Sequence, residues 1–292
     1  MTTYHSPLLV RPNMDSSEYM YIVPETAGWK YLSFAARKLE EMEKWVFQTR
    51  EYELALVILG GVCSVHSTRG EWKNIGRRAD VFSGMPFALY LPRQTEFTVE
   101  TISDSLDIAY GWVPTDEDHP PKLVTPESVG IEIRGGDNFT RQINSLIPPG
   151  FDCHRLVVVE VYTPSGNWSS YPGHKHDVHR VDEQGILQEA DLEEIYFYKI
   201  DKPENGYAIQ RVYNDDGSLD ELVLARNNHL VKIPEGYHPV VSPPGYNTYY
   251  LNFLAGSAQS LMSLDDPKYA WVKDRWQTQD PRVPVVSMDM EK

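Results

Sequence analysis

The chain has 292 residues, enough for one large domain or two domains of ordinary size, and its 41% hydrophobic residues are typical of a folded globular protein. It carries 42 acidic and 27 basic residues, which gives a formal net charge of −15. Because this excess of negative charge repels phosphate backbones and anionic lipid surfaces, we expect no nucleic acid and no membrane among its partners.

Two features of the sequence favour a cytoplasmic location. The first ten residues lack the basic segment and apolar stretch of a secretory signal, and the longest apolar run, 54–65, is too short to span a bilayer. Cys63 and Cys153 are too few for a disulfide framework and have no CxxC spacing. We therefore expect two buried thiols in a reducing compartment.

Short runs of β-branched and aromatic residues, separated by turns rich in Gly, Pro, Asn and Asp, recur along the chain. They predict an all-β fold made of sandwiches or small barrels. The expected strands lie at 53–59, 88–91, 96–102, 106–112, 156–163, 194–200, 207–213, 222–225, 229–233 and 247–253. Helical patterns occur only at 36–44, 138–146 and 267–277, which is too few for the repeated crossovers of an α/β fold.

A segment rich in Pro, Asp and Thr, 113–128, separates two strand-rich halves and is the expected linker. We place an N-terminal domain at 1–121 and a C-terminal domain at 122–292. Each half contains a turn with Gly and Pro that leads into a strand, at 83–99 and at 233–252. This shared plan is consistent with a duplicated barrel.

The C-terminal half holds a group of candidate metal ligands. His174 and His176 in HKHD are two residues apart, so their side chains share one face if the segment is a strand. Glu194 heads the apolar run IYFYKI, where Glu193 would face the other way, and His238 lies in the turn of PEGYHPV. Three imidazoles and one carboxylate suit a divalent ion, zinc first and manganese, iron or nickel as alternatives. The structural alternative is that these histidines lie on an exposed strand and in an ordinary turn.

Several blocks of the sequence resemble one family. They are HKHD, LEEIYFY, GYHPVVSPPGYNTYYLNFLAG and DPRVPVV, joined in the N-terminal half by RRADVFSGMPFALYLP. Together, between 47 and 286, they resemble the 5-deoxy-glucuronate isomerase family of inositol catabolism, a group of bicupins. The resemblance implies two jelly-roll barrels and assigns the metal to the C-terminal one. The 17 residues from Asp177 to Glu193 are longer than a simple cupin turn, which leaves Glu193 and His179 as alternative ligands.

The N-terminal half has no comparable cluster, because its His66 stands alone and no HxH pair occurs there. We expect this barrel to have no metal and to play a structural part. A binding role for Arg77, Arg78 or Asp80 is the alternative.

The resemblance implies conversion of 5-deoxy-D-glucuronate, a small sugar acid, to 5-dehydro-2-deoxy-D-gluconate. This aldose to ketose isomerisation removes the proton next to an aldehyde, and a divalent ion with open positions lowers the cost of the developing charge. The candidate catalytic residues are Tyr250 and Glu194, and the candidate substrate-binding residues are Arg211, Arg180 and Tyr198. Tyr196, Lys175 and Lys199 are alternatives for moving the proton or holding the carboxylate.

Three other functions remain open from the sequence. They are isomerisation of a 4-deoxy-5-keto uronate, oxygen chemistry at an iron-binding cupin, and sugar binding by a bicupin without catalysis. The absence of a helix-turn-helix pattern and of a basic patch disfavours a regulator that binds DNA. The sequence leaves the oligomeric state open, and a homo-oligomer is one alternative because related cupin isomerases commonly assemble.

Overall fold

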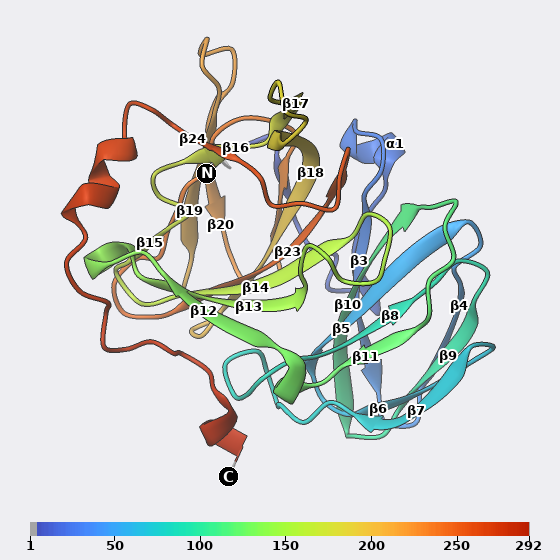
Figure 1. Ribbon diagram of the computed structural model, residues 1–292. Helices are drawn as coiled ribbons and strands as arrows, with labels where there is room; N and C mark the ends of the chain where they lie inside the picture. The colour runs from blue at the N-terminus through green and yellow to red at the C-terminus, as the bar shows by residue number, and fades with distance from the viewer. Residues whose placement is uncertain (1–4, 292) are drawn as a thin grey trace. The chain divides into compact units, whose positions relative to one another are not determined.

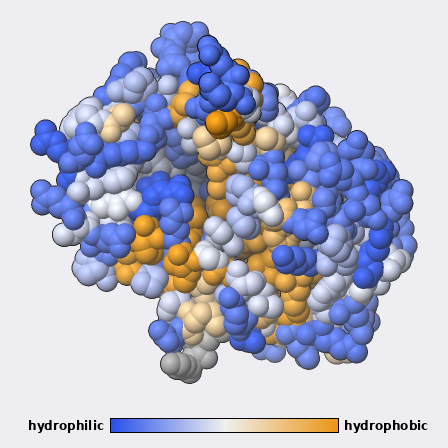
Figure 2. Space-filling model, viewed as in Figure 1, coloured by the Kyte–Doolittle hydropathy of each residue, from blue (hydrophilic) through white to orange (hydrophobic). Residues whose placement is uncertain are grey.

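The computed structural model describes residues 5–291 and consists mostly of β-strands (Figure 1). This confirms the all-β prediction. The described residues contain no helix with the length and hydropathy that a membrane span requires. Hydrophilic residues cover most of the face seen in Figure 2, as the charged composition leads one to expect.

The chain forms two compact units, and each is built from separate stretches of sequence. The N-terminal unit contains 13–130, 146–158 and 286–291, and the C-terminal unit contains 5–12, 131–145 and 159–285. This division differs from a single cut after residue 121. Strand pairing explains part of the difference, because Leu9 pairs with Val231 in the C-terminal unit.

A buried carboxylate explains another part. Glu53 is fully buried, and it accepts hydrogen bonds from the backbone amides of His154 (2.9 Å), Arg155 (2.7 Å) and Leu156 (3.1 Å). The Tyr90 hydroxyl donates a fourth bond of 2.9 Å. These contacts hold 154–156 within the N-terminal unit, although these residues follow the expected linker.

The N-terminal unit consists of two antiparallel sheets, ordered β11-β8-β5-β10-β3-β2 and β4-β9-β6-β7. Its strands are β2 (Glu18–Ile22), β3 (Ser33–Glu40), β4 (Lys44–Gln48), β5 (Tyr52–Gly60), β6 (Cys63–Ser67), β7 (Gly70–Ile75), β8 (Phe87–Leu91), β9 (Glu96–Thr101), β10 (Ser105–Pro114) and β11 (Lys122–Val124). Three short helices are α1 (Pro24–Ala27), η1 (Pro126–Ser128) and η4 (Met288–Glu291).

Apolar side chains from both sheets fill the interior of this unit. Leu54, Leu56 and Ile58 alternate along β5 and pack in one cluster with Val65 of β6 and Phe97 of β9. Alternation of this kind places every second side chain of a strand in the core. The interior is therefore an ordinary hydrophobic core.

The C-terminal unit has one large sheet, ordered β1-β21-β18-β23-β14-β13-β12, with β17 also paired to β18. A second sheet has the order β15-β22-β19-β20, and β16 pairs with β24. The strands are β1 (Leu9–Val10), β12 (Gly130–Arg134), β13 (Arg141–Ile147), β14 (Val157–Thr163), β15 (Trp168–Ser169), β16 (His174–Lys175), β17 (Asp177–Val181), β18 (Leu187–Ile200), β19 (Ala208–Tyr213), β20 (Asp220–Ala225), β21 (Leu230–Ile233), β22 (Val240–Val241), β23 (Thr248–Gly256) and β24 (Leu264–Asp265). The short helices are η2 (Asp137–Phe139) and η3 (Ala270–Arg275).

The interior of this unit lies between the two sheets. The Tyr198 hydroxyl of β18 donates a 2.8 Å hydrogen bond to Gln210 Oε1 of β19, which identifies the inner faces of both strands. Glu194 and Tyr196 lie on the same face of β18 as Tyr198, because side chains alternate along a strand. Polar side chains thus point into this barrel.

Two of the three predicted helices are wrong. Residues 36–44 form the end of β3, a turn and the first residue of β4, while 138–146 contain η2 and most of β13. Pairing with neighbouring strands outweighs local helix propensity in the first case. In the second, β13 is buried on both faces, so the two-residue alternation that marks a strand is lost. The third predicted helix, 267–277, contains η3.

Candidate active site

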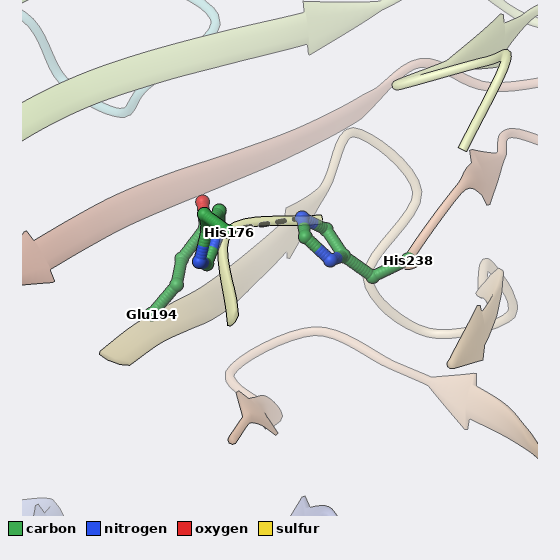
Figure 3. A group of neighbouring side chains, drawn as sticks. All are labelled: His176, Glu194 and His238. Atoms are coloured by element: carbon green, nitrogen blue, oxygen red, sulfur yellow. Dashed lines mark hydrogen bonds and ion pairs between the residues drawn. The ribbon is translucent and has the colours of Figure 1, made fainter. Parts of the chain in front are cut away.

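Three of the predicted ligands meet inside the C-terminal unit. His176 directly precedes β17, Glu194 lies in β18, and His238 lies in the turn between β21 and β22. Glu194 Oε2 is 2.9 Å from His176 Nε2 and 3.2 Å from His238 Nε2 (Figure 3). All three side chains are buried, and their ligand atoms lie within 4.8 Å of one another.

Backbone carbonyls orient both imidazoles. His176 Nδ1 lies 2.9 Å from the Leu192 carbonyl oxygen, and His238 Nδ1 lies 2.7 Å from the Gly236 carbonyl oxygen. A carbonyl only accepts, so each Nδ1 carries a proton and Nε2 is the ring nitrogen that faces Glu194. Carbonyl partners of this kind orient metal-binding histidines.

The local sequence around His238 makes this turn feasible. Gly236 has a φ of +89°, which glycine adopts without strain. A Cβ at this position would lie 2.6 Å from the Tyr213 carbonyl oxygen. A glycine is therefore required two residues before the ligand.

The electrostatics favour a cation at this place. Burial raises the pKa of Glu194, but the contacts with His176 and His238 outweigh burial and leave the pKa below its usual value. Burial lowers the pKa of His176, and the hydrogen bond to Glu194 outweighs it and raises the pKa. His238 Nε2 is buried and has no hydrogen-bond partner among the described residues. An ionised carboxylate beside two buried imidazole nitrogens is a donor set that fits a divalent ion.

His174 lies beside this group rather than in it. It belongs to β16, and its ring centroid is 4.7 Å from that of His238. Burial, His238 and His176 lower its pKa well below the usual value, so the ring is neutral near pH 7. His174 is therefore available as a nitrogen donor next to the three converging residues.

A cavity of about 400 Å³ opens onto the group, within the size range of ligand pockets. His174 and Glu194 line it, together with Tyr196 of β18 and Tyr250 of β23. Other lining residues recur at every second position of β13 and β14, namely Arg141, Ile143, Ser145, Val159 and Val161. The large sheet thus forms one wall of the cavity with its inner face.

Tyr250 is the predicted catalytic residue that reaches the cavity. Its hydroxyl contacts the Ser169 hydroxyl and lies 3.4 Å from Ser170 Oγ. Burial raises its pKa, although the nearby Arg141 and both serines act against this. The hydroxyl is therefore protonated near neutral pH and can donate to an oxygen atom of a ligand. Tyr198 is buried on the same face but does not line the cavity, because its hydroxyl is bound to Gln210.

The two predicted substrate-binding arginines do not line the cavity. Arg211 is half-buried, with Nε 2.7 Å from Asp220 Oδ1. Arg180 is exposed and has Nη2 3.1 Å from Glu189 Oε2. Both guanidinium groups are thus engaged by carboxylates on the outer surface.

The alternatives among the neighbouring residues lie elsewhere too. His179 is exposed and bonds to Ser257 Oγ through Nδ1, at 2.8 Å. Lys199 Nζ donates to Asn228 Oδ1 at 2.6 Å, and Lys175 is paired with Asp215. Glu193 is half-buried and does not belong to the three-residue group.

Sequence reasoning missed Arg141, a buried arginine in the cavity. It lies at the start of β13, in the stretch that resembles a helix. The only signal was a charged residue directly before a run with two β-branched residues, RQINSLI, and the pattern of that run is not a clean alternation.

The N-terminal unit also contains histidines near carboxylates, but their ring nitrogens have nearby partners. His154 Nδ1 is 2.8 Å from Thr115 Oγ1, and its Nε2 is 3.5 Å from Glu117. His119 bonds to Asp152 (2.7 Å) and Glu117 (2.9 Å), and both carboxylates are exposed. Asp116, Glu117 and His154 also come close enough to share an ion, but both carboxylates are exposed, unlike the buried group of the C-terminal unit.

The other candidates of the N-terminal half lie outside that cluster. His66 is exposed and paired with Glu71 at 2.7 Å. Arg78 is buried and donates to the Ile58 carbonyl, Arg77 is exposed 3.8 Å from Glu127, and Asp80 accepts from the Phe82 amide in a turn.

Comparisons with known proteins agree with this geometry. The model of the KduI/IolB family matches residues 8–272. The chain is 39% identical over 264 residues to a 5-deoxy-glucuronate isomerase of Geobacillus thermodenitrificans (strain NG80-2), covering 90% of this chain and 93% of the relative.

Solved structures give the same result. The crystal structure of an IolB-like protein from Salmonella typhimurium LT2 superposes with a TM-score of 0.86 at 36% identity, covering 91% of this chain and 98% of that one. The oxalate decarboxylase of Bacillus subtilis, described with Mn(II) centers, shares only the fold, at a TM-score of 0.57 and 9% identity over 84% and 74% of the two chains. The extent of the family match and the identity to the isomerase lead to one conclusion: the chain belongs to the KduI/IolB family.

Proposed function

We propose that the protein is an aldose–ketose isomerase that converts 5-deoxy-D-glucuronate to 5-dehydro-2-deoxy-D-gluconate. The observation that carries this proposal is the buried group of His176, Glu194 and His238 at the cavity, in a chain 39% identical to a 5-deoxy-glucuronate isomerase. Such a cavity, lined by hydroxyl, carboxylate and cationic side chains, suits a small polyhydroxy acid better than a flat or apolar ligand.

We further propose that His174, His176, Glu194 and His238 hold a divalent ion, zinc first and manganese, iron or nickel as alternatives. The buried Nε2 of His238, 3.2 Å from Glu194 Oε2, and the lowered pKa of Glu194 support this assignment. When bound, the ion would polarise the substrate carbonyl as a Lewis acid. The mixed nitrogen and oxygen set suits all four metals.

Two residues of the cavity would transfer the protons of the reaction. Tyr250 donates from its protonated hydroxyl to the substrate oxygen on which negative charge develops, and the hydroxyls of Ser169 and Ser170 hold it in position. Glu194 is ionised and can accept a proton through the oxygen that faces away from the histidines. The proton removed from the carbon next to the aldehyde is delivered to the aldehyde carbon. The hydroxyl on the neighbouring carbon becomes the ketone, and its proton replaces the one that Tyr250 gives to the former aldehyde oxygen, so the reaction needs no other reactant.

Turnover of 5-deoxy-glucuronate by the purified protein tests the proposal, with metal content determined by elemental analysis. We expect isomerisation, its loss on chelation and its return when a divalent ion is added back. A 4-deoxy-5-keto uronate is assayed in parallel. Turnover of that substrate alone would move the assignment to the other uronate isomerase, and consumption of oxygen would favour a dioxygenase.

A further inference from the structure

We propose that Arg141 binds the carboxylate of the substrate. This inference rests on the proposed function, because it assigns one end of a sugar acid to a residue of the same cavity. Three independent observations carry it: the burial of Arg141, the fact that no ion pair involves it among the described residues, and the engagement of the other cations around the cavity.

Arg141 has the burial of a core residue and the charge of a surface residue. Its exposed fraction is 6%, and it lines the cavity with His174, Glu194 and Tyr250. Its Nη1 has no hydrogen-bond partner among the described residues. Keeping a guanidinium in such a place without a partner costs free energy, so proteins rarely retain one unless a ligand compensates it.

The other two cations of the cavity wall already have partners. Arg134 donates to Glu132 from Nε (2.9 Å) and Nη2 (2.7 Å). Lys273 contacts the Asp265 carboxylate. Among the described residues, no ion pair involves Arg141, which makes it the cation of this wall that is free to receive an anion.

The chemistry of the group fits a carboxylate. A guanidinium offers two parallel N–H donors that match the two oxygens of a carboxylate. Gly135 lies next to Nη1, at a φ of +83°, and a Cβ there would approach Nη1 to 3.4 Å. The same Cβ would lie 2.1 Å from the Phe139 carbonyl oxygen, so only a glycine lets this turn pack closely against the guanidinium.

The position of Arg141 also agrees with the direction of the substrate. In open-chain 5-deoxy-glucuronate the carboxylate and the reacting aldehyde are at opposite ends of the six-carbon chain. Arg141 extends from β13, whereas Glu194 extends from β18, and β14 and β23 lie between these strands in the sheet. Anchoring of the acid by Arg141 leaves the aldehyde end to Glu194, His174 and Tyr250.

The test compares Arg141→Gln and Arg141→Lys with the wild type on two substrates. These are 5-deoxy-glucuronate and 5-deoxy-glucose, in which a hydroxymethyl group replaces the carboxylate. We expect Arg141→Gln to lower kcat/KM for the acid about 100-fold, mostly through KM, and to change that for the neutral sugar less than about threefold. Arg141→Lys is expected to recover part of the loss.

Two further variants make the comparison sharp. Arg226→Gln, which removes an exposed arginine of the same unit, is the matched control and should resemble the wild type. Arg211→Gln tests the competing assignment. If Arg211→Gln discriminates between the two substrates and Arg141→Gln does not, the inference is overturned.

Stability distinguishes ligand binding from a structural role. Because Arg141 forms no ion pair among the described residues, we expect Arg141→Gln to keep its metal content and to melt at the same temperature as the wild type or a few degrees higher. A clear fall in melting temperature together with an equal loss on both substrates would assign Arg141 to the fold and overturn the inference.

Calorimetric binding of D-glucuronate separates this inference from the proposed function. If the wild type binds this anion and Arg141→Gln does not, Arg141 is an anion site even when 5-deoxy-glucuronate is not turned over. If both proteins isomerise 5-deoxy-glucuronate equally, the function stands and the inference falls. Absence of binding and of turnover in the wild type would overturn both.

Discussion

The two barrels of this protein have similar strand arrangements and opposite interiors. The N-terminal unit fills its interior with residues such as Leu56, Val65 and Phe97. The C-terminal unit places Glu194 and Tyr250 in the corresponding space between its sheets, beside a cavity. Alternation puts side chains inside in both cases, and residue chemistry alone decides whether the interior becomes a core or a site.

The histidines of the two units teach the same lesson. In the N-terminal unit, His119 has exposed carboxylates for both ring nitrogens. In the C-terminal unit, backbone carbonyls take Nδ1 of His176 and His238, and the two Nε2 atoms converge on one buried oxygen. Two features therefore distinguish a candidate metal site from a surface charge cluster. The histidines are buried, and a backbone carbonyl binds only one nitrogen of each ring, so the other nitrogen faces the site.

The largest effect on activity is expected from His176→Ala in the C-terminal unit. Removing one imidazole takes away a donor and leaves Glu194 without its closest partner, so we expect metal content to fall from about one ion per chain to almost none. Isomerase activity should fall by about 1000-fold or more. Elemental analysis and a turnover assay measure both quantities, with His179→Ala as the control from the exposed surface. Full metal content in His176→Ala would refute the ligand assignment.

A substitution in the core of the N-terminal unit should lower stability instead of metal content. Leu56→Ala creates a cavity in a packed core and should lower the free energy of unfolding by about 2–5 kcal/mol. Metal content per folded chain should be unchanged. Urea denaturation followed by fluorescence measures the loss, and Val46→Ala, at an exposed position, should cost less than about 0.5 kcal/mol. Loss of metal in the folded Leu56→Ala protein would contradict the view that the core of the N-terminal unit contributes to stability and not to metal binding.

Tyr250→Phe tests chemistry without disturbing the ligands. It removes the hydroxyl that contacts Ser169 and should reduce kcat by about 100-fold at unchanged metal content. Tyr249→Phe is the matched control, since Tyr249 is the preceding residue of β23 and its hydroxyl bonds to Glu160 instead. Equal effects of the two substitutions on kcat would remove Tyr250 from the reaction.

The smallest effect is expected at His119 in the N-terminal unit. Burial lowers its pKa, but Asp152 and Glu117 outweigh burial and raise it. The protonated ring therefore stabilises the fold below the pKa of the unfolded chain, and this contribution is lost as pH rises through the folded-state value. His119→Gln should cost about 0.5 kcal/mol at pH 5.5 and nothing at pH 9, with solvent screening taken into account. Thermal melts at both pH values measure the difference, which should shrink in high salt.

The sequence allowed the fold class and the three converging residues to be predicted for identifiable reasons. The run IYFYKI has strong β propensity, and a carboxylate at its head is conspicuous because strands rarely bury one. His238 follows a glycine turn whose geometry leaves few directions for the ring. These signals are local, so they can be read from the chain.

Other features depend on tertiary pairing and could not be predicted. Arg141 lies in a strand that is buried on both faces. Arg211 was expected to bind the carboxylate of the substrate, but in the structure it is paired with Asp220. The domain boundary was placed at one point in the chain, whereas pairing of β1 with β21 and the contacts of Glu53 divide it at several. The fold, and not the local sequence, determines which charged side chains form ion pairs with one another.

The chain passes back and forth between the two units, and this limits where it can be divided into fragments that fold. A fragment that begins at residue 122 would lack β1, so the edge of β21 would present unpaired amides and carbonyls to solvent and to other chains. A fragment that ends at residue 121 would leave the Glu53 carboxylate buried without its three amide donors. The two barrels are therefore not detachable modules.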